Sequence, residues 1–432
     1  MDNFLKNKFS MEELGTDVKT EVLAGLTTFM TMAYVVIVHP SIMEGAGMPV
    51  EAMTVVTALV TGVFTIIMGL YTNLPFALAP AMGSNAFMAY TLVAAGVVNW
   101  QQGLGMVFIS GIAFILLTVL GLRKIIVDMV PSSIKFSIGA AVGLFIAQLG
   151  FSNAGFLDFD AGLLALGDIT ETGTILSIIG LFILMSLMVL DIKGGLFIGI
   201  IVTSLIGIPM GVTPLPDSLV SLPPSISPIA GELDVLGALR FSFIPLMFVF
   251  FSGDFFSTMG TLLGVANQAD MLDEDGNLPE IEKPFLVDGL ATTVGAFLGT
   301  TTVTTYIESA SGVEEGGRSG LTAIVTGLSF LLVIFFTPIV QVIPEEATAP
   351  ALILIGLLMM PAIKKINFDD FTESLPAFIT VMFTAYTFNL ANGISLGIIT
   401  YVFVKLVAGR KEEIPLGLYF LCIPLLYYFY TL

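Results

Sequence analysis

The chain of 432 residues is poor in the residues that build disulfide-linked or metal-binding proteins. It contains one cysteine, one histidine and one tryptophan. A single cysteine excludes a disulfide within the chain, and one histidine beside one cysteine excludes a zinc site of the usual composition. Charged residues make up only 11% of the chain, against about a quarter in soluble domains. We therefore expect no large water-soluble domain and no cofactor.

Apolar residues fill the chain instead. Hydrophobic residues account for 56% of it, and the mean hydropathy is +0.98. A helix of about 20 apolar residues crosses the hydrocarbon core of a bilayer, which is roughly 30 Å thick. Runs of that kind recur from residue 21 onward, whereas residues 1–20 are polar and carry no signal-peptide pattern. The sequence therefore predicts an all-α polytopic membrane protein with a polar N-terminal segment.

The hydropathy pattern predicts fourteen membrane-spanning segments. They are residues 21–38, 52–71, 80–96, 104–121, 134–150, 174–190, 194–210, 240–264, 284–299, 303–314, 319–340, 347–363, 372–389 and 393–408. The apolar tail at 415–432 follows them and either spans the membrane or lies along its interface.

The positions of the basic residues test this count. With a cytoplasmic N-terminus, 14 of the 15 lysines and arginines fall in inner loops, among them Arg123 and Lys124. Only Arg240 falls on the other side. Inner loops of membrane proteins carry such an excess of positive charge. We therefore predict a multi-pass protein of the cell membrane with both termini in the cytoplasm.

Two of the predicted segments are interrupted. Residues 73–90 read NLPFALAPAMGSNAFMAY, and residues 299–315 read GTTTVTTYIESASGVEE. Irregular backbone at membrane depth is tolerated only beside protein or a cavity. Interrupted segments at matching places of two halves indicate the binding site of a secondary transporter. They predict two inverted repeats of seven segments, with short strands in segments 3 and 10.

A weak internal match supports the repeat. Residues 130–146 read VPSSIKFSIGAAVGLFI and residues 343–359 read IPEEATAPALILIGLLM, which align Gly143 with Gly356. We expect these two glycines to let helices approach closely rather than to contact a ligand.

Two carboxylates stand out in apolar surroundings. Asp254 lies within FFSGDFFSTMG, where a charge at the bilayer centre costs about 2.5–3.5 kcal/mol. Glu308 lies at a predicted strand-to-helix junction, where its neighbours Thr305 and Ser309 can hydrogen-bond it. Asn85 occupies the corresponding place in the first half. The alternative for either carboxylate is an ion pair, a helix cap or a solvated group at the interface.

Together these groups describe a polar, mildly acidic pocket halfway through the membrane. The carboxylates accept hydrogen bonds from ring N–H groups, and Asn85 donates to a ring carbonyl or nitrogen. Phe87, Phe255 and Phe256 offer aromatic faces, although core packing explains most phenylalanines equally well. Such a pocket suits a flat heteroaromatic solute, and a carboxylate inside it can carry a proton.

The same stretches resemble one known family over nearly the whole chain. TFMTMAYVVIVHPSIM (28–43), FFSGDFFSTMGTLLGVA (250–266) and GTTTVTTYIESASGVEEGGRSGLTAIVTG (299–327) are similar to azaguanine-type purine permeases. These belong to the nucleobase–cation symporter superfamily with the uracil-permease fold. The resemblance implies a core domain from residues 21–121 and 240–340 and a gate domain from residues 134–210 and 347–408. It also implies two short strands that meet where the purine binds.

The resemblance also implies site residues. Asp254 and Glu308 would hold the base and couple its movement to a proton rather than to Na⁺. The resemblance further implies contacts from Asn85, Phe87, Thr258 and the backbone of Ile307. We add Thr305 and Ser309 as neighbours of Glu308, and Ser257 as the residue at the place of a family carboxylate. The chain departs from the family at Ser257, where a second aspartate is usual, and at His39, where asparagine is usual. The implied partner is a purine such as hypoxanthine, guanine or adenine.

Three other classes of function remain open at this point. An anion transporter of the same fold would need positive charge in the site. A channel would need a filter or ring of residues. An intramembrane aspartyl protease needs two adjacent aspartates, but Asp288 is expected near the inner end of segment 284–299, away from Asp254. We expect no enzymatic activity, a lipid bilayer as surroundings, no nucleic-acid partner, and either a monomer or a homodimer.

Overall fold

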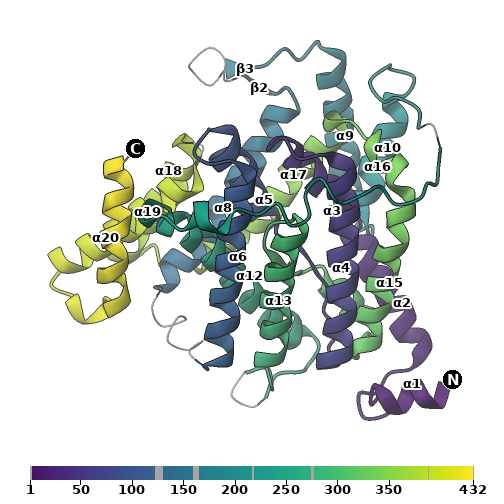
Figure 1. Cartoon of the computed structure of the whole chain (residues 1–432), viewed down its shortest axis with the longest axis horizontal. Helices are drawn as coiled ribbons and strands as arrows, with labels where there is room; N and C mark the ends of the chain where they lie inside the picture. The colour runs from purple at the N-terminus through teal and green to yellow at the C-terminus, as the bar shows by residue number, and fades with distance from the viewer. Residues whose placement is uncertain are drawn as a thin grey trace.

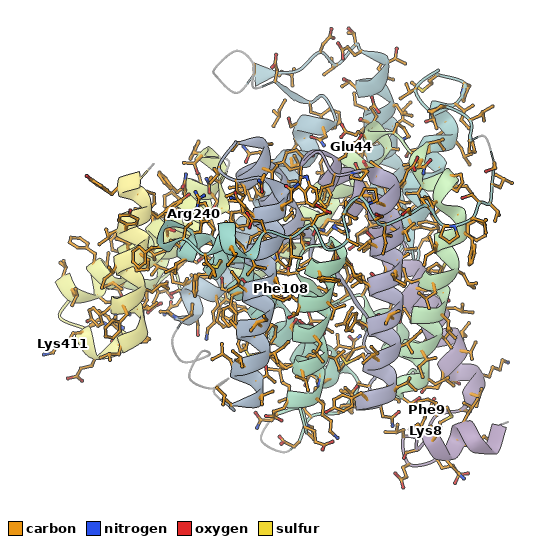
Figure 2. All side chains as sticks on the ribbon, viewed as in Figure 1. Lys8, Phe9, Glu44, Phe108, Arg240 and Lys411 are labelled. Carbon is orange, nitrogen blue, oxygen red and sulfur yellow. The ribbon has the colours of Figure 1, made fainter. Side chains whose placement is uncertain are left out.

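The computed structural model describes residues 2–121, 130–158, 165–216, 218–273, 277–387 and 389–431. Arg123 and Lys124, which we place in an inner loop, lie outside the described residues. Most of the described chain forms helices, and the long helices of the central bundle run side by side (Figure 1). Lys8 and Glu44 lie at opposite ends of this bundle (Figure 2), as the predicted topology requires.

The helices and strands follow the predicted order of segments. In the first half they are α1 (Asp2–Lys8), α2 (Val18–Met32), α3 (Val35–Glu44), α4 (Val50–Thr72), β1 (Leu78–Pro80), α5 (Met82–Ala86), the π-helix η1 (Phe87–Ala94), α6 (Trp100–Val119), α8 (Ser132–Asn153), β2 (Leu157–Asp158), β3 (Ala165–Leu166), α9 (Thr172–Val189) and α10 (Gly195–Gly207).

The remaining helices and strands form the second half of the chain. It contains α11 (Val235–Ala238), η2 (Phe241–Phe243), α12 (Ile244–Gln268), α13 (Glu282–Leu298), β4 (Val303–Thr305), α14 (Ser309–Glu314), α15 (Gly320–Val333), η3 (Ile334–Phe336), α16 (Thr337–Gln341), α17 (Glu345–Met359), η4 (Met360–Lys365), α18 (Phe371–Thr387), α19 (Leu390–Val407), η5 (Lys411–Glu413) and α20 (Leu416–Thr431).

The predicted membrane segments can all be found among these elements. In the described part of the chain, nine helical stretches are long and apolar enough to cross a membrane. Three further segments correspond to the shorter helices α10, α13 and α18, and segments 3 and 10 are the interrupted ones. With the nine long stretches, they correspond to the fourteen predicted segments. The first segment differs from its prediction, because a turn at Ala33 and Tyr34 divides it into α2 and α3. Hydropathy alone gives no sign of this turn.

The two interrupted segments meet as a pair of short strands. β1 and β4 pair in antiparallel fashion, with Leu78 opposite Thr305 and Pro80 opposite Val303. This confirms the strands predicted in segments 3 and 10. Pro80 lacks an N–H group and Val303 is β-branched, so both residues favour extended backbone over helix. The second strand pair, β2 with β3, was not predicted.

Glycine sets the distance between the helices that pack most closely. A Cβ atom on Gly143 of α8 would lie 2.7 Å from the carbonyl oxygen of Gly356 of α17. The expectation that Gly143 and Gly356 permit a close helix approach is therefore confirmed. The same arrangement joins α4 to α15, where a Cβ on Gly62 would lie 2.8 Å from the carbonyl oxygen of Gly327. Small residues at helix interfaces are how membrane proteins gain packing contacts.

The apolar tail forms a helix that runs back along α19. Tyr428 in α20 donates a hydrogen bond of 2.9 Å to Oδ1 of Asn392, at the start of α19. The 16 residues of α20 cover about 24 Å, somewhat less than the hydrocarbon core. The two chain ends lie at opposite corners of the molecule (Figure 1). This geometry favours a C-terminus on the face opposite to the N-terminus, contrary to the sequence-based expectation.

Candidate functional site

Helix α12 presents two different faces at the centre of the molecule. Asp254 and Thr258 are buried, with exposed fractions of 1% and 0%, and point toward α13 and β4. A neighbouring side of the helix carries Gly253, Ser257, Gly260 and Gly264, which we call the open face of α12. A Cβ atom added to Gly253 or Gly260 would meet no other atom within 4 Å, and Ser257 is exposed. The structure therefore separates Ser257 from Asp254 and Thr258.

Asp288 lies in the second turn of α13, near the start of that helix as expected, yet beside Asp254. Its side chain is fully buried, and its Oδ2 accepts three hydrogen bonds. The donors are the Thr258 hydroxyl at 2.8 Å, the Thr305 backbone N–H at 2.9 Å and the Thr305 hydroxyl at 3.1 Å. The interpretation that this position keeps Asp288 from pairing with Asp254 is wrong. Position along a helix does not reveal which residues of other elements enclose it.

Asp254 and Asp288 form a buried carboxyl pair that is held by threonine side chains. Asp254 Oδ2 accepts a hydrogen bond of 2.7 Å from the hydroxyl of Thr292, which lies one turn after Asp288 on α13. Among the described residues, Oδ1 of each carboxyl group has no hydrogen-bond partner. Two carboxylates buried close together repel each other, so binding of a proton by one of them relieves the repulsion.

Glu308 is held by a residue from the first segment. Its Oε1 accepts a hydrogen bond of 2.7 Å from the hydroxyl of Tyr34. Glu308 itself is half-buried, and the adjacent Ile307 is 56% exposed, with its Cδ1 4.0 Å from a Cβ placed on Gly264. Ile307 therefore lies beside the open face of α12 at Gly264, and Glu308 is the next residue along the chain.

The neighbours of Glu308 serve other partners. Thr305 bonds Asp288, and the Ser309 hydroxyl accepts a hydrogen bond of 3.0 Å from the backbone N–H of Ala77, just before β1. The expectation that Thr305 and Ser309 hydrogen-bond the Glu308 side chain is therefore wrong. They fix β4 and β1, the strands on which the site is built.

The first interrupted segment contributes packed residues. Asn85 is fully buried, and its Oδ1 accepts a hydrogen bond from Thr301. Phe87 packs edge-on against Phe250, with ring centres 5.1 Å apart. Neither side chain reaches the open face of α12 in this structure.

The adjacent phenylalanines Phe255 and Phe256 of α12 differ in their burial. Phe255 is buried among Phe114 and Phe285, with ring centres 5.3 Å away in both cases. Phe256 is only partly buried, and the Lys135 ammonium group of α8 lies 5.2 Å from its ring centre. Among the described residues, no group of three or more His, Cys, Asp or Glu side chains is arranged to hold a metal ion.

The known proteins to which this chain is similar are permeases and transporters. The chain is 41% identical to the adenine permease AdeQ of Escherichia coli, over 95% of this chain and 93% of that protein. It is 37% identical to the guanine/hypoxanthine permease PbuG of Bacillus subtilis, over 98% and 99%. The transmembrane domain of the cyanobacterial bicarbonate transporter BicA shares the fold, with a TM-score of 0.65 and 14% identity. The match covers 87% of this chain and 97% of that domain.

A match to a family model shows to which protein family the chain belongs. The model described as Permease family matches residues 19–396, which include every candidate site residue. Its members are transporters, not enzymes. This excludes the protease alternative, which the adjacency of Asp254 and Asp288 would otherwise have strengthened. The chain belongs to the Permease family.

Proposed function

We propose that this permease carries purine nucleobases across the cell membrane, with the base held between Glu308 and the open face of α12. The observation that carries the proposal is a half-buried carboxylate beside a helix face without side-chain bulk. The chain is similar over nearly its full length to adenine and guanine/hypoxanthine permeases, which supports purines as the substrate class.

The chemistry of the site fits a flat base. Glu308 accepts hydrogen bonds from ring N–H or exocyclic amino groups, and the Ser257 hydroxyl both donates and accepts. Gly253 and Gly260 leave room for a planar ring to lie against the helix backbone. The negative charge of Glu308 opposes the binding of an anion such as bicarbonate. The likeness to BicA therefore extends to the fold, while the site favours a neutral base.

Proton coupling is assigned to the buried pair. In this proposal one carboxyl group of the pair Asp254 and Asp288 binds a proton, and Thr258, Thr292 and Thr305 connect the pair to α12, α13 and β4. Uptake or release of that proton changes the charge at the point where these elements join. The sequence alone favours Glu308 as the proton carrier, but Glu308 stands beside the open face, where it can contact the base. We propose that Glu308 binds the base and that the aspartate pair couples transport to H⁺ rather than Na⁺.

Movement of one group of helices against another would carry the base across. Helix α15 packs on α2 and α4, and α13 packs on α6, which gives a core group with α12. Helix α17 packs on α8 and α9, and α18 packs on α8 and α19, which gives a gate group. The contact of Lys135 with Phe256 joins the two groups beside the site. We assign residues 21–121 and 240–340 to the core domain and residues 134–210 and 347–408 to the gate domain.

The topology of the chain ends is open to a direct test. A reporter fused after Gly409 should give a cytoplasmic signal, because η5 and its basic residues follow the last spanning helix. A reporter fused after Leu432 should give the opposite signal, because α20 returns along α19. Paired fluorescent and alkaline phosphatase fusions measure both positions. Cytoplasmic signals at both positions would mean that α20 lies along the interface.

Ligand-induced stabilisation tests the substrate class. A ligand that binds the folded protein at 100 times its Kd adds about 2.7 kcal/mol of stability. Hypoxanthine, adenine or guanine should therefore raise the melting temperature of the purified protein, and bicarbonate or sulfate should not. Glu308→Gln should lose the purine effect. Glu314→Gln is the matched control, since Glu314 is the last residue of α14, the helix that Glu308 precedes, and accepts a hydrogen bond from Gln268. Stabilisation by bicarbonate with none from any purine would overturn the proposal.

A further inference from the structure

Tyr34, which lies at the break in the first membrane segment, contacts Glu308. Helix α2 ends at Met32 and α3 begins at Val35, so Tyr34 lies in the turn between them. The Tyr34 side chain points inward and is only 2% exposed. Its hydroxyl donates to Glu308 Oε1 across 274 positions of sequence. Ala33 and Tyr34 keep right-handed helical backbone angles, so the break between α2 and α3 lies in the hydrogen-bonding pattern.

The Glu308 side chain is bound by Tyr34 and not by the helix that follows it. Glu308 precedes α14, and its side chain makes no capping hydrogen bond to that helix. Among the described residues, Tyr34 is the side chain that donates to it. Without that bond the Glu308 side chain would be free to choose among several rotamers.

We propose that Tyr34 is a positioning residue for purine recognition: its hydroxyl fixes one oxygen of Glu308 and leaves the rest of the half-buried carboxylate to the base. This inference rests on the proposed function of Glu308. A hydrogen bond to a carboxylate that is already oriented costs the substrate less entropy than one to a mobile side chain. Tyr34 therefore acts on the affinity for the base through Glu308, without contact to the base.

Tyr306 provides a matched control. It is also a buried tyrosine, two residues before Glu308, but its hydroxyl donates to the carbonyl oxygen of Pro80 at 2.5 Å. Tyr306→Phe removes a buried hydroxyl from the same region without touching Glu308. Effects seen in Tyr34→Phe but not in Tyr306→Phe belong to the Glu308 contact.

The test measures uptake of radiolabelled hypoxanthine by proteoliposomes. Tyr34→Phe should raise KM about tenfold, near the upper end of the cost of ordering one flexible side chain on binding, and change the maximal rate less than about twofold. Tyr306→Phe should leave KM within about threefold of the unsubstituted protein. An unchanged KM in Tyr34→Phe, or an equal rise in KM in Tyr34→Phe and Tyr306→Phe, would overturn the assignment.

Melting temperatures separate this inference from the proposed function. The Tyr34–Glu308 contact predicts that Tyr34→Phe lowers the melting temperature by more in the Glu308-containing protein than in Glu308→Ala, where the acceptor is absent. If Tyr34→Phe fails to fold, recovery of folding in the double variant supports the contact, and failure of the double variant overturns it. An unsubstituted protein that takes up no purine refutes the proposed function and with it the role in recognition, while the melting data still decide the contact.

Discussion

Replacing Asp288 by asparagine should abolish accumulation of purine driven by a pH gradient, while exchange of purine for purine continues. An asparagine in this place cannot bind or release a proton, although its carbonyl can still accept from Thr258 and Thr305. A gradient of one pH unit supports about tenfold accumulation per coupled proton, since a tenfold ratio corresponds to about 1.4 kcal/mol. Uptake against an imposed pH gradient in proteoliposomes measures this ratio, which should fall to about one.

Asp270→Asn is the control for this variant, because Asp270 is exposed in the turn after α12. It should accumulate purine as the unsubstituted protein does. Asp254→Asn should behave like Asp288→Asn, since either substitution removes one member of the pair. If Asp288→Asn concentrates purine normally, the coupling proton lies elsewhere, and Glu308 becomes the next candidate.

Introducing a leucine at Gly320 should prevent the protein from folding. Gly320 in α15 and Gly69 in α4 bring their backbones into direct contact, and a Cβ on either one would overlap the carbonyl group of the other. Neither backbone can withdraw without separating the two helices, so we expect a loss of about 3 kcal/mol or more. The yield of monodisperse protein in size-exclusion chromatography and its melting temperature measure the effect.

Gly260→Leu is the matched control for Gly320→Leu. Gly260 lies on the open face of α12, where a Cβ meets no other atom within 4 Å. This variant should fold normally and lose purine transport, because the leucine occupies the place proposed for the base. Equal yields of Gly320→Leu and Gly260→Leu would show that the packing of α4 on α15 tolerates a large side chain.

The arrangement of segments along the chain could be predicted from the sequence, because hydropathy and irregular composition are local properties. The prolines and threonines of the two interrupted segments indicated β1 and β4 before any pairing was known. The turn at Ala33 and Tyr34, the π-helix η1 and the return of α20 along α19 depend on packing between distant helices. Local composition carries no information about such packing.

The residues of the candidate site could also be predicted only in part from the sequence. Asp254 and Glu308 were recognisable because each carries a charge within apolar or small neighbours. Asp288 follows Glu282 and Lys283 closely, so it looked like part of a solvated helix end. Its partner Thr258 is 30 residues away, and only the fold brings them together. The sequence did not indicate a role for Tyr34, since a tyrosine in an apolar run is common.

Uptake of radiolabelled hypoxanthine by proteoliposomes containing the purified protein tests the proposed function most directly. We predict saturable uptake that rises with an inward proton gradient, falls when a protonophore is added, and is inhibited by adenine or guanine but not by bicarbonate. Glu308→Gln should reduce uptake strongly, and Glu314→Gln should not. Uptake of labelled bicarbonate without uptake of any purine, or purine uptake that is unaffected by Glu308→Gln, would contradict the proposed site and its substrate.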